Sequence, residues 1–313
     1  MSMLRPLRYH RLRLEILNKP GGKDRRAPNN SGLKYGIRFP GNAKEAAQFD
    51  QKNGNKIWAN AILKELEALM SMKLFRKLPL SLRKARAKGF QFALLRMIFD
   101  VKVDLRRKAR IVIGGHVVDS SRNKVYPSTM KSVSARILMK ILAENNLDVM
   151  TGDIGNAYLN TNTQENIYTH AGTEFELVGI MSEGNLLEVI KALYGLPTSR
   201  NRWHAHLSHN LREMGLKPTR FDPYVWIRGR EGGYDYTGMH TNDVLIVSVE
   251  PTSTFDKLKE TYTIKAFGLP KVHIGCDYAQ VKKGATTRWI MGRYTYITEC
   301  LMKVCALIKV TSL

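Results

Sequence analysis

The sequence has few cysteines and few acidic residues for its length of 313 residues, and both shortages exclude classes of protein. Its three cysteines, Cys276, Cys300 and Cys305, are not spaced as a zinc site or a disulfide framework, and they suit a reducing compartment. Its 27 acidic residues stand against 50 lysines and arginines, which gives a net charge of +23 and a pI of about 10.0. A field of this size favours a polyanion as partner, with strongly salt-dependent binding.

Long apolar stretches are also missing. No run reaches the roughly 18 apolar residues that a membrane-spanning helix needs, so we expect no transmembrane segment. Binding to an anionic membrane surface would need a basic amphipathic helix or an apolar anchor, and we expect no membrane association. The basic start of the chain is not followed by the apolar core of a secretory signal, which favours an intracellular protein.

The apolar content of 43% is enough for a folded core, in one large domain or two small ones. Residues 1–34 differ from the rest because they are rich in Arg, Lys, Pro, Gly and Asn. We interpret them as a solvated, disordered tail, with a specific nucleic-acid arm as the alternative.

The spacing of apolar residues predicts helices over Ala43–Leu74, Ser132–Asn145, Ser199–Met214 and Thr252–Tyr262. Ser132 or Ser134 is the expected cap of the second helix, and Gly215 is the expected stop of the third. Leu78–Gly89 is strongly basic, and we interpret it as a solvated loop, with phosphate contact as the alternative.

β-prone runs fall into three groups. Phe92–Val103 and Ala109–Val117 predict a hairpin with a cationic tip. Pro223–Ile227 and Tyr234–His240 predict a second hairpin, and Lys265–Ile290 alternates further β-prone stretches with Gly and Lys turns.

Two strand-like segments carry the acids that we single out. In Gly152–Asn160 (GDIGNAYLN), Asp153 ends an apolar run and is followed by a small-residue turn and by Tyr158. One carboxylate cannot hold a catalytic Mg²⁺ alone, so a second acid is needed. Tyr236–Ser248 (YTGMHTNDVLIVS) supplies one, because it predicts a tight hairpin with Asp243 at its turn. The alternative for this segment is an ordinary Asn-Asp turn on a surface hairpin.

Four segments, in order, carry a resemblance to a known family. They are Lys108–Val112 (KARIV), Gly152–Asn160, Leu193–Leu196 (LYGL) with Trp203 beyond it, and Met239–Ser248. They resemble the KARLV element, the Asp-containing strand, the LYGL…W element and the double-acid hairpin of the reverse transcriptase domain of Ty1/copia-type retrotransposons. The resemblance runs from about Tyr35 to about Tyr296.

The resemblance implies an α+β fold of the right-hand polymerase type, with fingers and palm, built on a mixed antiparallel sheet with helices packed on one face. It assigns residues 35–296 to fingers and palm and residues 297–313 to the start of a truncated thumb or connection segment. Implied partners are an RNA or DNA template-primer duplex and deoxynucleoside triphosphates, with other domains of a retrotransposon polyprotein as further partners.

The resemblance also implies roles for individual residues. Asp153 and Asp243 would hold two catalytic Mg²⁺ ions, or Mn²⁺ in their place. Lys108 and Arg110 would meet the triphosphate of the incoming nucleotide, and a Lys point charge and an Arg fork both suit phosphate oxygens. Tyr158 would lie under the nucleotide's sugar and exclude a 2′-hydroxyl; the alternative is an aromatic side chain that packs beside the turn.

One position departs from the family. Asn242 stands where the family has the first of two adjacent aspartates. An Asn can still offer one oxygen to a metal, but it removes a negative charge from a site that positions Mg²⁺-bound phosphates. Two hypotheses follow: an RNA-directed DNA polymerase, and a catalytically inactive nucleic-acid-binding relic of the same domain. A basic RNA-binding protein of unrelated fold would require four ordered motifs to be coincidence.

Overall fold

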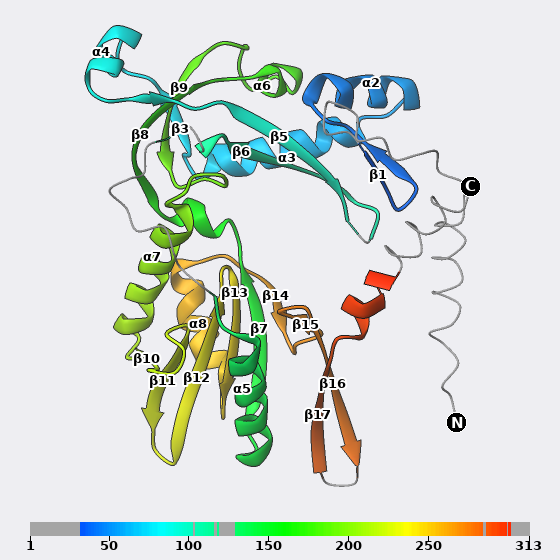
Figure 1. Ribbon diagram of the computed structural model, residues 1–313, viewed down its shortest axis with the longest axis vertical. Coiled ribbons are helices and arrows are strands. Elements are labelled where there is room, and N and C mark those ends of the chain that lie inside the picture. Colours follow the sequence, from blue (N-terminus) through cyan, green and yellow to red (C-terminus); the bar gives the residue numbers. More distant parts are fainter. Residues whose placement is uncertain are drawn as a thin grey trace. The chain divides into compact units, whose positions relative to one another are not determined.

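The computed structural model describes residues 32–102, 104–115, 118, 129–283, 286–298 and 300–301. The chain divides into two compact units (Figure 1). Unit 1 comprises Met1–Asn123 and Thr161–Ser199, and unit 2 comprises Lys124–Asn160 and Arg200–Leu313. Most of the predicted tail, and most of the predicted thumb segment, lies outside the described residues. No helix in the described part of the chain is long and apolar enough to cross a membrane.

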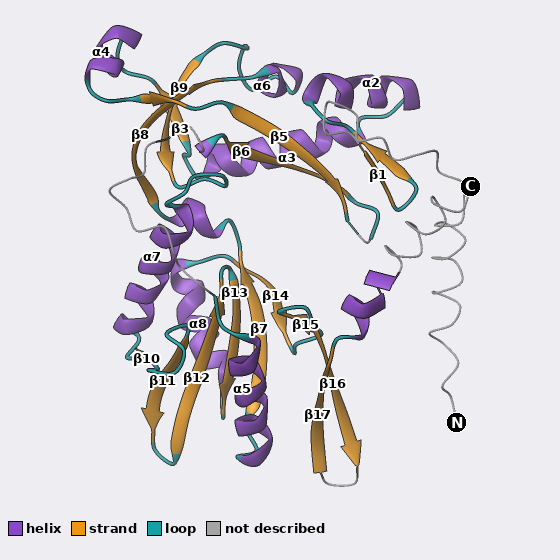
Figure 2. Ribbon diagram, viewed as in Figure 1, coloured by secondary structure: helices purple, strands orange, loops and turns teal. Residues whose placement is uncertain are grey.

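The described residues of unit 1 form helices and three small sheets (Figure 2). Its helices are α2 (Ala43–Asn53), α3 (Ile57–Ser71), α4 (Leu82–Ala87) and α6 (Thr173–Leu177). Its strands are β1 (Gly32–Lys34), β2 (Ile37–Phe39), β3 (Phe75–Lys77), β4 (Gln91–Phe92), β5 (Leu95–Val101), β6 (Arg107–Ile113), β8 (Asn162–His170) and β9 (Leu186–Lys191). One sheet has the order β3-β9-β8-β4, and β1-β2 and β5-β6 are antiparallel hairpins.

The first predicted helix is in fact two helices. Gly54, with a φ of 62°, ends α2 in the left-handed conformation, and its N–H donates to Asp50 O and Gln51 O. The buried Asp50 carboxylate then accepts the N–H groups of Trp58 (3.1 Å) and Ala59 (2.8 Å), at the start of α3. The prediction of a single helix was wrong because the apolar period continues across a break that Gly54 and Asp50 make.

The predicted hairpin in this unit is confirmed as β5-β6. Its side chains alternate between a buried and a more exposed face from Leu95 to Val101 and from Lys108 to Ile113. The buried face packs on α3, where Phe99 meets Trp58 edge to face with ring centroids 5.6 Å apart. The basic segment before it is not wholly a loop, because Leu82–Ala87 forms α4 with Ala85 buried beneath it.

Unit 2 is built on a six-stranded sheet of order β10-β11-β12-β13-β7-β14. Its strands are β7 (Asp148–Ile154), β10 (Lys217–Pro218), β11 (Val225–Arg230), β12 (Gly233–His240), β13 (Asp243–Ser248) and β14 (Ile264–Gly268). A second sheet joins β15 (Val272–His273), β16 (Cys276–Lys283) and β17 (Thr286–Gly292). The helices are α5 (Ser132–Glu144), α7 (Ser199–Glu213) and α8 (Pro251–Thr261), with a 3₁₀ turn η2 (Ala157–Asn160).

Helices cover both faces of the six-stranded sheet. Leu245 and Val247 of β13 pack in one apolar cluster with Leu138 of α5. Ser248, the next residue, points to the opposite face, where the side chains of Asp235 and Arg228 link it to α8. The prediction of helices on one face was therefore wrong, because β13 is buried on both faces and needs apolar cover on each. All neighbouring pairs of the six strands are antiparallel; a parallel pair occurs in unit 1, between β4 and β8.

The predicted cap of α5 also differs. The residue that caps α5 is Lys131, which makes no side-chain cap bond. Ser134 instead donates its hydroxyl to the buried Asp222 carboxylate, which also accepts the backbone N–H of Lys131. The serine therefore fastens the helix to the loop before β11 and does not satisfy the helix's own N–H groups.

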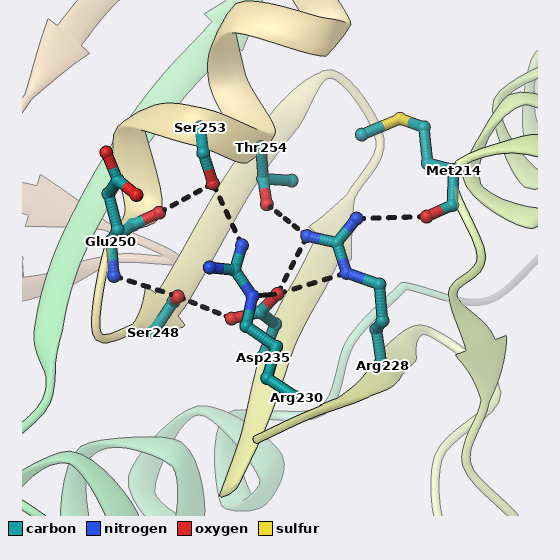
Figure 3. A network of polar contacts seen from close by, with 8 residues as sticks. All are labelled: Met214, Arg228, Arg230, Asp235, Ser248, Glu250, Ser253 and Thr254. Carbon is teal, nitrogen blue, oxygen red and sulfur yellow. Dashed lines mark hydrogen bonds and ion pairs between the residues drawn. The ribbon is translucent and has the colours of Figure 1, made fainter. Parts of the chain in front are cut away.

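A buried ionic network fastens the β11-β12 hairpin to α8 (Figure 3). Asp235 is fully buried and forms ion pairs with Arg228 and Arg230, whose guanidinium groups also bond Thr254 and Ser253 of α8. Burial alone would raise the pKa of Asp235, but hydrogen bonds from Ser248 and the two arginines outweigh it and hold the pKa below the usual range. Because one buried carboxylate neutralises both arginines, removing Asp235 would leave two largely buried cations without an anion.

Candidate acidic site on the unit 2 sheet

The two predicted acids are direct partners across neighbouring strands. Asp243 is the first residue of β13 and pairs in register with Asp153, the next-to-last residue of β7. Cross-strand partners have Cβ atoms about 5 Å apart and point to the same face. The two carboxylates therefore share one face at one end of the sheet. Because β13 lies between β12 and β7, the alternative of an ordinary surface hairpin was wrong.

The turn beside Asp243 is held in place from two sides. Thr241 and Asn242 connect β12 to β13, and Thr241 has a φ of 59°, a conformation that β-branched residues rarely adopt. The indole N–H of Trp203 donates to Thr241 O (2.6 Å), and the backbone N–H of Ile154 donates to Asn242 O (2.8 Å). These two bonds over-determine the strained turn and so place Asn242 against β7.

The side chain of Asn242 reaches Asp153 directly. Its amide N–H donates to Asp153 Oδ1, in a bond between the turn and β7. An aspartate at position 242 would have only acceptor oxygens and would repel the Asp153 carboxylate. The amide thus does more than lack a charge, since it occupies an oxygen of the acid that the resemblance assigns to the metal.

Register adds two further side chains to the same face. His240 of β12 pairs with Asp243, and Lys265 of β14 pairs with Asp153, so the row across the four strands reads His240, Asp243, Asp153, Lys265. The stem of Lys265 passes over Gly155, where an added Cβ would lie 2.8 Å from Lys265 Cε and 3.1 Å from Nζ. Neither residue could be predicted from the sequence, because the register of β12 on β13 and of β14 on β7 leaves no local signal.

Burial and charge alter the acid and the histidine of this row. Burial, and in second place the charge of Asp153, raises the pKa of Asp243 to about 6. Burial lowers the pKa of His240, and Arg200 nearby acts in the same direction. Ionising both Asp153 and Asp243 near neutral pH is therefore unfavourable, and a bound cation would lower the free energy of the doubly ionised state.

The two carboxylates, of Asp153 and Asp243, fit a hard divalent ion whose remaining ligands are oxygens of substrate and water. Mg²⁺ is usually bound by one or two carboxylates together with phosphate oxygens. In the described part of the chain no group of three or more His, Cys, Asp and Glu side chains is arranged to hold a metal. Asp153 and Asp243 are thus the candidate protein ligands, and Asn242 competes for one oxygen of the first.

The predicted nucleotide-binding cations lie together in unit 1. Lys108 and Arg110 alternate on the less buried face of β6. The Arg110 guanidinium lies 4.9 Å from the ring centroid of Tyr194, which orients it. The backbones of Gly115 and Gly195 cross so closely that a Cβ on either would come within 2.1 Å of a carbonyl oxygen, and Gly195 has a φ of 101°. This close crossing explains why the LYGL segment needs its glycine.

Tyr158, the predicted sugar contact, lies in unit 2 on η2, directly after the turn that follows Asp153. Asn156, with a φ of 51°, makes that turn as expected. The Tyr158 side chain is 8% exposed. Its role toward a nucleotide stays a prediction, as do those of Lys108 and Arg110.

The fold and site together define a basic protein of mixed helices and sheets with a paired-carboxylate site, and comparison with known proteins makes this specific. Residues 82–308 match the family described as "Reverse transcriptase (RNA-dependent DNA polymerase)". The chain belongs to this family.

Curated relatives are transposon polyproteins. The Retrovirus-related Pol polyprotein from transposon TNT 1-94 of Nicotiana tabacum is 24% identical over 218 residues, which cover 67% of this chain and 16% of that protein. The one from transposon RE1 of Arabidopsis thaliana is 23% identical over 184 residues, which cover 57% of this chain and 12% of that protein. The matched region thus spans less than a fifth of either relative. The resemblance to a Ty1/copia-type reverse transcriptase domain is confirmed.

Proposed function

We propose that this chain is the RNA-directed DNA polymerase of a Ty1/copia-type retrotransposon, with unit 2 as palm and unit 1 as fingers. The register pairing of Asp153 with Asp243 on one sheet face carries the proposal. Residues 35–296 would form fingers and palm, and residues 297–313 would begin the thumb or connection segment. The titles of the relatives support a polyprotein as the natural setting, with other domains as partners.

The reaction joins a deoxynucleotide to a primer paired with its template. The primer's 3′-hydroxyl oxygen attacks the α-phosphorus, the hydroxyl passes its proton to solvent, and the bond from the α-phosphorus to the bridging oxygen breaks to release pyrophosphate. Asp153 and Asp243 would hold two Mg²⁺ ions, or Mn²⁺; when bound, these supply activation of the hydroxyl and neutralisation of the triphosphate. Lys108 and Arg110 would contact the triphosphate, and Tyr158 would contact the sugar.

A second candidate is a catalytically silent, nucleic-acid-binding relic of the same domain. The hydrogen bond from the Asn242 amide to Asp153 favours it, because the amide competes with a metal ion for one oxygen of that acid. Loss of one electrostatic contributor to a matched site costs about 3 kcal/mol, or roughly a hundredfold in rate. Both candidates predict salt-sensitive binding to duplex and hybrid, so binding alone cannot separate them.

Primer extension on an RNA template, with Mg²⁺ and then Mn²⁺, separates the two. We would compare the chain as given with Asn242→Asp, Asp153→Asn and the matched control Asp256→Asn, an exposed acid in the same unit. If the given chain and the control extend the primer and Asp153→Asn does not, the polymerase proposal holds. If Asn242→Asp extends at least a hundredfold faster, the amide is what limits the rate. If no variant extends while all bind the hybrid, the relic is correct.

A further inference from the structure

An aromatic ring stands exposed at the edge of the four-stranded sheet in unit 1. Phe92, at the end of β4, is 41% exposed. It pairs in parallel register with Tyr168 of β8, and its ring lies 5.5 Å from that of Tyr168 and 5.3 Å from that of His170. Two rings therefore support Phe92 from within the sheet and fix its orientation, while much of its surface faces solvent.

Cations lie on α4, a helix that is fastened to β8, the strand that pairs with β4 (Figure 1). The helix is fastened to the sheet because Ala85 packs on Tyr168, and Arg86 Nε–H donates to the Tyr168 hydroxyl (3.4 Å). Asn166 of β8 donates to Lys88 O (3.4 Å), which fixes the chain as it leaves the helix. The basic segment and the aromatic ring thus share Tyr168 and one strand as their support.

The charges of this segment are not neutralised within the described residues. Arg83, Lys84, Arg86 and Lys88 are all exposed, and none of them forms an ion pair there. Arg76 on β3 makes the contrast, since Glu188 binds its guanidinium through two bonds of 2.8 Å. Arg76 is therefore neutralised within its sheet, whereas the α4 cations are available to bind an external anion.

We propose that Phe92, Arg86 and Lys88 form a binding surface for single-stranded nucleic acid, which we call the α4 platform. Cations beside a supported aromatic ring match what single strands offer, namely phosphates and an unpaired base face. A duplex hides its base faces in the stack, so Phe92 would contribute little to duplex binding. An anionic membrane fits less well, because α4 buries Ala85, half-buries Leu82 and exposes only the small apolar side chain of Ala87, which is no anchor for a lipid surface.

The α4 platform goes beyond the proposed polymerase function and does not depend on it. Its residues belong to unit 1, whereas Asp153, Asn242 and Asp243 belong to unit 2. The difference in binding between the original chain and its platform variants, measured without a divalent ion or nucleotide, therefore reports on the platform, and its outcome is separate from that of primer extension.

Fluorescence anisotropy of the full chain with a labelled single strand and with a duplex of equal length tests the proposal. Phe92→Leu keeps an apolar side chain but loses the π-face, so affinity for the single strand should fall about fivefold or more while affinity for the duplex stays unchanged. Phe92→Trp should bind the single strand at least as tightly as the original. The matched control is Ile57→Ala, an exposed apolar residue on α3.

The cations are tested by salt dependence. Arg86→Gln with Lys88→Gln should lower the slope of log K against log salt for the single strand by about 1.4, or about 0.7 per lost phosphate contact. Lys44→Gln with Lys52→Gln, two exposed lysines on α2, changes the net charge equally and should leave the slope unchanged.

The proposal is overturned if Phe92→Leu binds the single strand as tightly as the original, or if its affinity for single strand and duplex falls alike. It is also overturned if the substitution lowers only the affinity for anionic vesicles, included as a third ligand. An independent test uses the unaltered chain with a single strand that carries 5-iodouracil. Photochemical cross-links should map to the peptide containing Phe92, and cross-links found only elsewhere would exclude the α4 platform whatever the variants' folding.

Discussion

At the residue scale, the side chains around Asp153 decide the charge of the candidate site. Asn242 donates to its carboxylate, Lys265 stands opposite it on β14, and Asp243 stands opposite it on β13. Asp153 therefore has a donor, a cation and an acid around it. A divalent ion that binds here must compete with the first two and is favoured by the third.

The raised pKa of Asp243 has a consequence for stability. Since the folded-state pKa of about 6 exceeds the ordinary 3.8, stability from the protonated acid is fully present below about pH 4 and is lost as the pH rises through 6. The Asp243→Asn variant does not lose this stability. Relative to the original chain, its free energy of unfolding should therefore rise by about 1 kcal/mol from pH 4 to pH 7, a figure reduced for partial exposure. Urea unfolding at both pH values measures this, with Asp256→Asn as the control that should show no gain.

Lys265 should weaken divalent-ion binding at the acids. Lys265→Gln removes a positive charge opposite Asp153. This repulsion is worth about 1 kcal/mol in high-dielectric surroundings, so the variant should bind a divalent ion about fivefold more tightly. Electron paramagnetic resonance of Mn²⁺ titrated into the apo chain measures the change. Lys271→Gln, at an exposed lysine of the same unit, should leave the affinity as it was. Equal affinity in all three chains would mean that Lys265 does not act on the site.

At the scale of the element, a β-turn is held by a helix that lies far from it in sequence. Trp203 of α7 donates its indole N–H to Thr241 O, although Thr241 precedes β13 and α7 precedes β10. Trp203 is a core residue of α7, with 1% of its surface exposed. The hydrogen bond is a further role that periodicity does not reveal.

Trp203→Phe tests that bond against a matched tryptophan. Trp226 is equally buried, but its Nε1 has no hydrogen-bond partner within the described residues. Both substitutions remove similar volume, and only the first leaves a turn carbonyl without its donor, so Trp203→Phe should cost about 1–3 kcal/mol more stability than Trp226→Phe. Urea unfolding measures the difference. Equal costs would show that the turn does not depend on the indole.

At the scale of the whole molecule, we expect the net charge of +23 to govern affinity for nucleic acid. Neutralised phosphates release counterions, so affinity for a template-primer duplex should fall by about a thousandfold or more between 50 and 200 mM salt if six or more phosphates are contacted. Filter binding across that range measures the slope. A fall of less than about tenfold would mean that the positive charge is spread over surface that does not face nucleic acid.

Local patterns in the sequence predicted much of this protein. The apolar periods located α5, α7 and α8, the β-prone runs located the β5-β6 and β12-β13 hairpins, and the four ordered motifs identified the family. Each of these features depends on residues that are close together along the chain, where side-chain spacing has a direct structural meaning. The break at Gly54 and the short helix α4 were missed, because the apolar period runs through the first and the basic composition hides the second.

The sequence by itself determined which residues are acidic, which are apolar at a regular period, and that position 242 carries an amide beside Asp243. Only the tertiary structure decided that Asp153 pairs with both Asp243 and Lys265, that the Asn242 amide bonds Asp153, and that helices cover both faces of the sheet. The physical reason is that strand register and sheet order join segments separated by a hundred residues or so, and a one-residue slip would turn every side chain of a strand to the other face.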